Sequence, residues 1–420
     1  MNEPSRLGDA FMERQLYGAR SAHAAATGIT ELAPDLYCLE SFGNVGVAVT
    51  SEGVVVIDTG SPTNPQAVLV PLRQVTDQPV RFIIYTHGHA DHAANALPLL
   101  HEAAARGDSR PHIIGHVHVL RRMARYAELH GQQAFINRLQ FRIPEALPGF
   151  PSDQQFVRPD LTYETQMTFR LGDLSFELCH AMGETDDATW VYVPERQVVF
   201  SGDLYVSSCP NIGNPLKVQR YEVEWAEALE QIAALGAEVL SPGHGPVLRA
   251  EAITEALLTT ARALRYLHEE VVRRLNLGQW QEQIVDEVHL PPDLATHSAL
   301  APIYGCPAYI VRAIVRRYAG WYDGNPSHLS PSPTSAIAAE VLTLAGNRAL
   351  LDRAEHLRSE GHHQLALHLL DFVIDGTSDA GEKRQALRLK SASLEQLAST
   401  ETSYISRSIL SRSAEQLAGN

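Results

Sequence analysis

The chain has 420 residues, more than a single domain usually contains, so we expect a main domain and at least one further domain. Hydrophobic residues make up 45% and charged residues 20%, which is typical of globular proteins and excludes a disordered or fibrous chain. The formal net charge of -15 argues against nonspecific binding to nucleic acid, whose phosphates would be repelled. No apolar run reaches the length of about 18 residues that a membrane-spanning helix needs, so no membrane span is expected.

The N-terminus and the cysteines indicate the cellular compartment. Charged residues such as Glu3, Arg6 and Asp9 precede any apolar run, so we expect no secretory signal and predict a cytoplasmic location. The cysteines lie far apart and show none of the paired spacings of a zinc knuckle or a disulfide framework. We therefore predict that they are reduced and mostly buried: Cys38, Cys179, Cys209 and Cys306.

Short β-branched runs separated by Gly, Asp and Asn dominate from about residue 30 to residue 245. Several of these runs end in a polar residue just where a loop begins, which places functional side chains along one edge of a rigid sheet system. The predicted strands are Leu36–Glu40, Val45–Thr50, Val54–Asp58, Phe82–Thr86, Ile113–His116, Leu174–His180, Thr189–Val193, Val198–Ser201 and Val239–Ser241.

Helical periodicity dominates the rest of the chain and indicates a change of domain. Leu257, Leu264, Leu267 and Val271 recur at helical spacing and predict one long amphipathic helix over Glu251–Asn276. A proline-rich linker is expected over Ser327–Pro333, followed by short-connected helices that resemble helical-hairpin repeats. The predicted helices are Ile337–Leu344, Leu350–Glu360, His363–Val373 and Gly381–Leu397. This tail has no convergent group of metal ligands, so we interpret it as a packing or dimerisation module.

A compact H-x-H-x-D-H loop follows the strand predicted at Phe82–Thr86. It contains His87, His89, Asp91 and His92. Zinc and iron favour imidazole nitrogen and carboxylate oxygen, and a loop leaving a strand can aim alternate side chains at two adjacent ions. A solvated histidine-rich loop is the alternative interpretation, but the spacing and the strand context favour a metal site.

Further potential ligands stand near the ends of later strands, each beside a glycine that lets the backbone approach an ion closely. Glu184 follows Gly183, Asp203 follows Gly202 and His244 lies between Gly243 and Gly245. In isolation each short motif would be read as an ordinary turn. Their order after the histidine loop favours the metal-site interpretation.

These motifs resemble the metallo-β-lactamase superfamily over approximately residues 30 to 250. The resemblance implies an α/β fold, an αββα sandwich, followed here by an all-α C-terminal dimerisation domain. It implies a first metal at His87, His89 and Glu184, a second at Asp91, His92 and His244, a bridging Asp203, and an Asp58 that braces the histidine loop. Most members carry a histidine where this chain has Glu184, and that glutamate is characteristic of the alkylsulfatase branch.

A second stretch resembles the same branch. Residues 303–307 (IYGCP) and 318–326 (YAGWYDGNP) are similar to the alkylsulfatase dimerisation region, which implies a homodimer. Core packing is an equally good interpretation of Trp321 and Tyr322. The sequence stops before the sterol-carrier-like domain of full-length alkylsulfatases, so a shortened architecture is expected. We predict a catalytic domain at 1–250, a helical extension and linker completing the site at 251–332, and a dimerisation domain at 333–420.

The segment after Asp203 departs from the branch. Alkylsulfatases resemble one another in an arginine that helps to hold the sulfate, and Leu216 stands in its place here. Lys217 is a point charge without the two-pronged geometry of arginine, so weaker and less selective sulfate binding is expected. The predicted substrate contacts are Asn211, Lys217, Arg220 and Tyr304.

The combined interpretation is a binuclear metal-dependent hydrolase of small anionic esters, with organic alkyl sulfates as the favoured substrates. Two Zn2+ ions, or alternatively Fe or mixed Fe/Zn, would hold a metal-bridging hydroxide that Asp91 and Asp203 orient as catalytic residues. One alternative is a hydrolase of lactones, thioesters or phosphodiesters with the same ions. Another is a di-iron oxygen-activating oxidase or hydroxylase, because Glu184 makes the first site harder. An inactive scaffold is disfavoured, since competent donors fill all the ligand positions.

Overall fold

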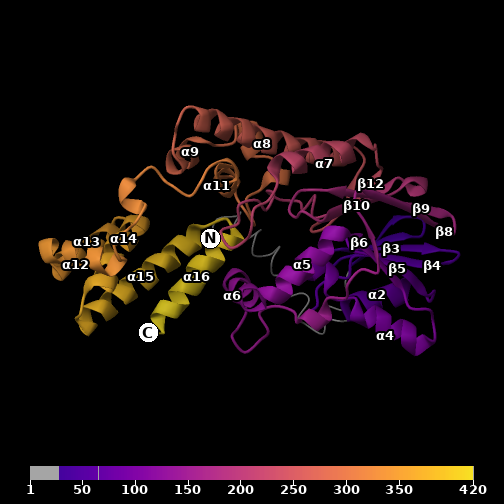
Figure 1. Cartoon of the computed structure of the whole chain (residues 1–420), viewed down its shortest axis with the longest axis horizontal. Helices are drawn as coiled ribbons and strands as arrows, with labels where there is room; N and C mark the ends of the chain where they lie inside the picture. The colour runs from indigo at the N-terminus through magenta and orange to yellow at the C-terminus, as the bar shows by residue number, and fades with distance from the viewer. Residues whose placement is uncertain (1–27, 65, 420) are drawn as a thin grey trace. The chain divides into compact units, whose positions relative to one another are not determined.

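The computed structural model describes residues 28–64 and 66–419. These residues form two compact units. One unit holds 28–64, 66–135 and 148–319, and the other combines 136–147 with 320–419. Figure 1 labels many of the elements of both units along the chain.

The first unit contains a seven-stranded sheet whose strands follow chain order. Neighbours are antiparallel from β1 to β4 and parallel from β4 to β7. The central strands read as continuous apolar runs because helices and a second sheet cover both faces. The strands are β1 (Ile29–Ala33), β2 (Leu36–Leu39), β3 (Val45–Thr50), β4 (Gly53–Ile57), β5 (Val80–Ile84), β6 (His112–His116) and β7 (Leu161–Tyr163).

A six-stranded sheet in the order β13-β12-β11-β10-β9-β8 lies against the first. Its pairs are antiparallel except for β11 and β12, which are parallel. The strands are β8 (Gln166–Leu171), β9 (Leu174–Ala181), β10 (Ala188–Val193), β11 (Val198–Gly202), β12 (Val239–Pro242) and β13 (Leu248–Arg249).

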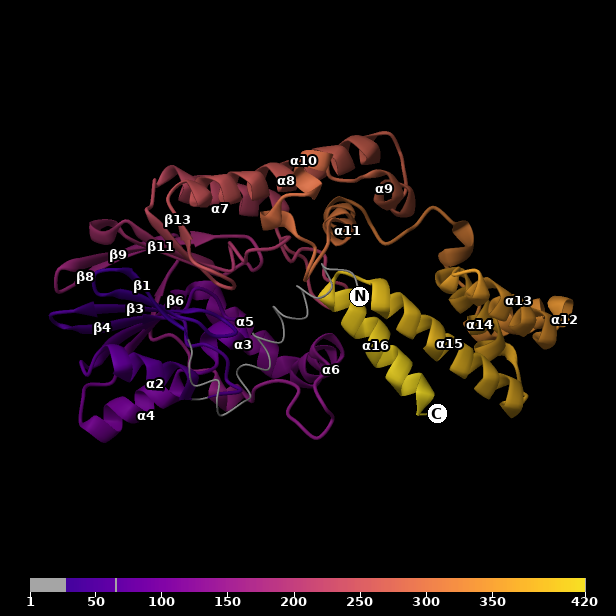
Figure 2. The same ribbon diagram turned by 180° about the vertical axis from the view of Figure 1, so that it is seen from behind.

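Three apolar layers hold the unit together. Between the sheets, Ile57 and Ile84 pack with Phe176 and Phe200 of the facing sheet. Outside the first sheet lie α2 (Gln66–Val75), α4 (Leu97–Arg106) and α5 (Val117–Glu128), and outside the second lie α7 (Glu222–Ala234), α8 (Glu251–Asn276) and α11 (Pro307–Tyr318). The two opposite views show these helices on the outer faces (Figures 1 and 2). This arrangement confirms the predicted αββα sandwich.

The predicted strands are all present, with ends shifted by two residues or fewer. Four strands without a clear apolar pattern were not predicted, namely β1, β7, β8 and β13. In β8 the side chains alternate between exposed and half-buried, and β7 and β13 are very short. The helices that cover the first sheet also escaped prediction, as did α3 (Ala90–Ala93), α6 (His130–Phe141), α9 (Gln281–Glu287) and α10 (Pro292–Ala295). The long predicted helix matches α8 at both ends.

The second unit is built of short-connected helices, as predicted for the C-terminal region. They are α12 (Thr334–Ala345), α13 (Asn347–Ser359), α14 (His363–Gly376), α15 (Ala380–Thr400) and α16 (Tyr404–Ala418), of which α16 was not predicted. Leu351, Leu370 and Val373 form part of their core. The segment 136–147 joins this unit, where Arg142 pairs with Glu415 at 2.5 Å.

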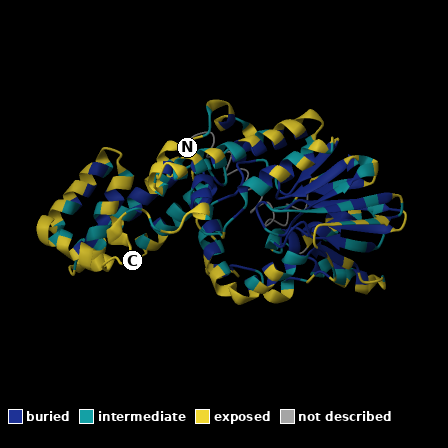
Figure 3. Ribbon diagram, turned by 45° about the horizontal axis from the view of Figure 1, so that its top comes forward, coloured by how far each residue is buried: buried dark blue, intermediate teal, exposed yellow. Residues whose placement is uncertain are grey.

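Burial follows this architecture, since the strands are mainly buried and the outer faces of the helices are exposed (Figure 3). Cys38, Cys179, Cys209 and Cys306 are free thiols, two of them buried and two half-buried. Among the described residues, no helix combines the length and apolar content that crossing a bilayer requires.

Candidate metal centre

The histidine loop begins where β5 ends and leads into the short helix α3, and Asp58 braces it from below. Asp58 Oδ1 accepts a hydrogen bond from the backbone N–H of Thr86, and Oδ2 accepts one from the Thr86 hydroxyl, both at 2.7 Å. The same Oδ2 lies 2.7 Å from His92 Nδ1, so His92 keeps Nε2 for the interior of the site. Asp58 adopts a left-handed φ of 65°, which costs about 1 kcal/mol and is retained by these three contacts.

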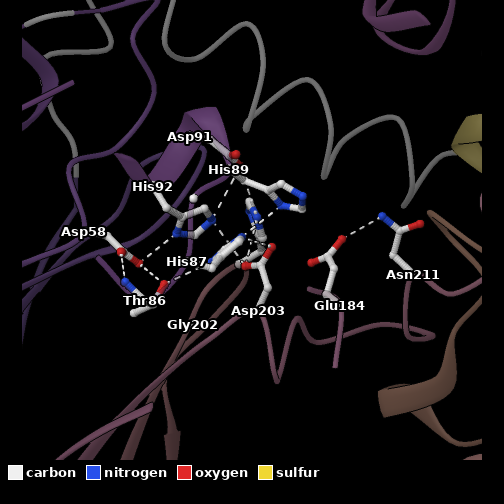
Figure 4. Close-up of polar contacts among 12 residues, drawn as sticks. Asp58, Thr86, His87, His89, Asp91, His92, Glu184, Gly202, Asp203 and Asn211 are labelled. Carbon is white, nitrogen blue, oxygen red and sulfur yellow. Dashed lines mark hydrogen bonds and ion pairs between the residues drawn. The ribbon is translucent and has the colours of Figure 1, made fainter. Parts of the chain in front are cut away.

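Two groups of side chains converge at the edge of the sheets (Figure 4). The first group comprises His87, His89, Glu184 and Asp203, and the second comprises Asp91, His92 and His244. The potential ligand atoms within each group lie within 4.8 Å of one another. Each residue that the sequence assigned to a metal is therefore a member of one group or the other.

Asp203 lies between the two groups. Its Oδ2 is 3.5 Å from His87 Nε2, and its Oδ1 is 3.3 Å from both His92 Nε2 and His244 Nε2. His244 Nε2 also lies 3.4 Å from Asp91 Oδ2. A carboxylate with one oxygen toward each group has the geometry that a bridging ligand needs.

His244 is held by a residue that the sequence analysis missed. The buried Asn44 donates from Nδ2 to the carbonyls of Pro242 and Gly245, at 3.0 and 2.9 Å, and so clamps the turn that carries His244. Within the same turn, Gly243 lies directly against the Asp203 carboxylate, where a side chain would not fit. Local sequence gives no sign of Asn44, because its contacts span about 200 positions.

Glu184 enters the first group from the loop after β9 and is almost fully buried. Arg220 forms an ion pair with Glu184 Oε1 and also donates to the Asn211 carbonyl at 2.6 Å. Asn211 Nδ2 donates to the same Glu184 oxygen at 3.0 Å. Two of the predicted substrate contacts thus lie beside a predicted metal ligand.

The electrostatics show how strongly these charges interact. Burial would raise the pKa of Asp203, but His244, His92 and His87 hold it well below its usual value. Burial would lower the pKa of His244, yet Asp203 and Asp91 raise it to about 10. Burial raises the pKa of Glu184 to about 8 even though Arg220 lowers it. The lowered pKa of Asp203 and the raised pKa of His244 both reflect attraction between imidazole and carboxylate, and bound divalent cations would attract the same carboxylates.

The donor set fits two divalent metal ions. Imidazole nitrogen and carboxylate oxygen suit zinc and iron, and two groups that share one carboxylate suit an adjacent pair. Within the described residues, neither His92 Nε2 nor Asp203 Oδ1 has a hydrogen-bond partner of good geometry, although both are buried. Buried polar atoms without partners usually mark a missing ion or water.

The remaining predicted substrate contacts lie on nearby loops. Burial and the nearby Arg220 lower the pKa of Lys217 to about 8, and the carboxylates of Glu184 and Asp91 oppose this only in part. Tyr304 is half-buried, and its neighbour Gly305 lies beside Asn211, so that a Cβ on Gly305 would stand 3.7 Å from Asn211 Cα. Leu216 is half-buried on the segment between Asn211 and Arg220.

The sequence between β11 and α7 is supported by residues 301–317. Cys209 N donates to the Ala301 carbonyl at 3.0 Å, and Gln219 Nε2 donates to the Ala313 carbonyl at 3.0 Å. Gly213 lies against the backbone of Tyr309. The segment that carries Asn211, Lys217 and Arg220 is thus supported along its length by α11 and the loop before it.

Comparison with known families accounts for most of the chain. Residues 39–244 match the family model of the metallo-beta-lactamase superfamily, and residues 281–420 match that of alkyl sulfatase dimerisation. Residues 39–244 therefore belong to the metallo-beta-lactamase superfamily, and residues 281–420 to the alkyl sulfatase dimerisation family. This confirms the predicted family and the order of its two parts.

Individual relatives carry alkylsulfatase names. A linear primary-alkylsulfatase of Pseudomonas sp. (strain ATCC 19151) is 27% identical over 77% of this chain, and an (R)-specific secondary-alkylsulfatase of Pseudomonas sp. is 23% identical over 88%. The solved structure of a stereoselective inverting sec-alkylsulfatase from Pseudomonas sp. shares the fold, with a TM-score of 0.81 and 20% identity over 93% of this chain. The chain spans 59 to 65% of the length of these three relatives.

Proposed function

We propose that this protein is a binuclear metal-dependent hydrolase of organic sulfate esters. The observation that carries the proposal is the pair of ligand groups, with Asp203 of the first group also facing His92 and His244 of the second and with Glu184 paired to an arginine. The alkylsulfatase names of its relatives favour sulfate esters over other esters.

The side chains suggest which group would perform each part of the hydrolysis. Two divalent cations bound here would supply Lewis-acid chemistry and a water of lowered pKa. Asp91 and Asp203 carry carboxylate oxygens that can accept hydrogen bonds from an attacking water and orient it. Lys217 and Arg220 bring positive charge to the edge of the site, and Asn211 adds an amide donor for the sulfate oxygens.

We further propose zinc as the metal, with iron or a mixed pair as the alternative that the same ligands permit. The domain limits 1–250, 251–332 and 333–420 remain our proposal for the functional parts, with 251–332 completing the site. The proposed assembly is a homodimer through the C-terminal region. A cytoplasmic location remains a prediction.

The test is metal content and ester hydrolysis measured on the same purified sample. About two metals per chain and turnover of alkyl sulfates are expected. Asp203→Ala should lose the bridge, bind fewer metals and lose hydrolysis while the domain stays folded. Asp173→Ala, at an exposed aspartate of the same unit, is the matched control and should change neither quantity.

The alternatives give different results in this assay. Turnover of a lactone, thioester or phosphodiester with no activity on any sulfate ester would keep the metal centre and change the substrate. Iron with oxygen-dependent turnover would favour an oxidase. Retention of two tightly bound metals by Asp203→Ala would refute the assignment of the bridge.

A further inference from the structure

A buried ion pair beside the metal centre has no role in the function proposed above. Asp187, on the loop between β9 and β10, has no exposed surface, and its partner Arg122 of α5 is 5% exposed. Arg122 Nε donates to Asp187 Oδ2 at 2.9 Å, and Arg122 Nη2 donates to Asp186 Oδ1 at 2.5 Å. Burying two charges is costly, so a pair in this position calls for a reason.

The carboxylate of Asp187 reaches the centre of the histidine loop. Its Oδ2 accepts a hydrogen bond from the backbone N–H of Gly88 at 3.0 Å, across 99 positions of sequence. Gly88 stands between His87 and His89, both members of the first ligand group. A Cβ on Gly88 would lie 2.9 Å from Arg122 Cδ and 3.0 Å from Asp187 Oδ2, so the ion pair is packed closely against the loop.

Asp187 is also tied to Glu184 by chain connectivity, since only two residues separate them. The hydrogen bond to Gly88 therefore joins the loop that carries Glu184 to the loop that carries His87 and His89. Asp58 does not perform this task, because it contacts Thr86 and His92 at the two ends of the histidine loop.

We infer that Asp187, supported by Arg122, is a positioning residue that sets the first metal site independently of the second. By accepting the hydrogen bond from the Gly88 N–H, Asp187 fixes the distance between Glu184 and the two histidines His87 and His89. Contacts that orient metal ligands from behind typically change metal affinity by about 10- to 100-fold when removed. This inference depends on the proposed metal centre and adds a residue to it.

The test is a titration of the metal-free full-length chain with Co2+, in which calorimetry and visible absorption both measure binding of the ion. The wild type should bind two ions. Asp187→Ala should weaken one of them by about 10- to 100-fold and leave the other within about threefold. The visible absorption band of the weakened Co2+ ion should also be absent in His89→Ala. This would identify the weakened ion as the one at the first site.

Two variants separate the hydrogen bond from the buried charge. Asp187→Asn keeps an oxygen acceptor for Gly88 and should bind both ions within about threefold of wild type. The double variant Asp187→Leu with Arg122→Met removes both charges, so it should fold even if Asp187→Ala does not, and should still lose first-site affinity. Asp186→Asn is the matched control, because it contacts Arg122 but not Gly88, and it should bind both ions normally.

The outcomes are distinct. Unchanged binding of both ions by the folded double variant would overturn the inference while leaving the proposed metal centre intact. Equal weakening of both ions would also overturn it, since a general loss of structure would then be the cause. Failure of the wild type to bind Co2+ would refute the metal centre itself.

Discussion

Lys217 and Arg220 lie on the same segment but have different electrostatic roles. Burial raises the pKa of Glu184 to about 8, and the buried, ion-paired Arg220 opposes part of this rise. Lys217 is half-buried, and burial lowers its pKa to about 8. We therefore expect Arg220 to act on the first ligand group as well as on the substrate, and Lys217 to act mainly on the substrate anion.

Substitution should separate these two roles. Lys217→Met should raise KM by an amount equivalent to about 1 to 3 kcal/mol, through the loss of one charged hydrogen bond, with metal content unchanged. Arg220→Met should raise KM and also lower metal content, because Glu184 loses its cation. Arg220→Lys keeps the charge and should retain metal. Steady-state kinetics and metal analysis on each variant check this, and strong activity indifferent to both positions would place the anion elsewhere.

At the scale of elements, α11 supports the segment between β11 and α7, which carries Asn211, Lys217 and Arg220, although α11 lies about 100 positions further along the chain. Gly213 has a φ of 74° and touches the backbone of Tyr309, so both its conformation and its lack of a side chain matter. The beginning of the dimerisation match thus belongs structurally to the unit that contains the candidate metal centre.

Two glycine variants separate the effect of the contact with α11 from the effect of backbone strain. Gly213→Ala should displace the segment from α11 and raise KM at least about tenfold, equivalent to about 1.4 kcal/mol, while both metals stay bound. Gly236→Ala is the control, because its φ of 63° imposes the same backbone strain, but among the described residues no atom beyond its chain neighbours lies within 4 Å of its new Cβ. Kinetics of the two variants are compared at equal folded fraction. An identical effect on KM would mean that strain, and not the contact with α11, is responsible.

At the scale of the whole molecule, the helical unit leaves apolar side chains uncovered. Ile337 and Leu344 are 43% and 89% exposed and stand seven positions apart on α12, so they share one face of that helix. An exposed apolar face within the alkyl sulfatase dimerisation match is the surface we expect a second copy to cover.

Placing charge on that face should weaken self-association. Replacing Ile337 and Leu344 together by Glu should raise the dimer dissociation constant at least about tenfold, because each buried aliphatic side chain contributes about 1.5 to 3 kcal/mol. Leu277→Glu is the control, since Leu277 is 68% exposed but lies outside the match. Sedimentation velocity measures the result. A wild-type chain that is monomeric at micromolar concentration would contradict the dimer itself.

Local sequence was sufficient to predict the strands that bury apolar runs and the ligand motifs at their ends. The run Val54–Ile57 predicts a buried strand because its four residues are all apolar, and the spacing of His87, His89, Asp91 and His92 favours a metal site because few other roles need those donors so close together. The metal ligands themselves remain predictions until metal binding is measured.

Apart from Asp58, only the tertiary structure decided which side chains hold those ligands in place. Asn44 clamps the turn of His244, and Asp187 reaches Gly88, through contacts that cross about 200 and about 100 positions. A hydrogen bond between distant residues imposes no periodicity on either of them, so neither segment carries a local pattern that predicts it. The same reason explains why 136–147 joins the helical unit and why α11 joins the sheets. Which segments share a compact unit depends on packing between distant parts of the chain, and this packing forms only when the chain folds.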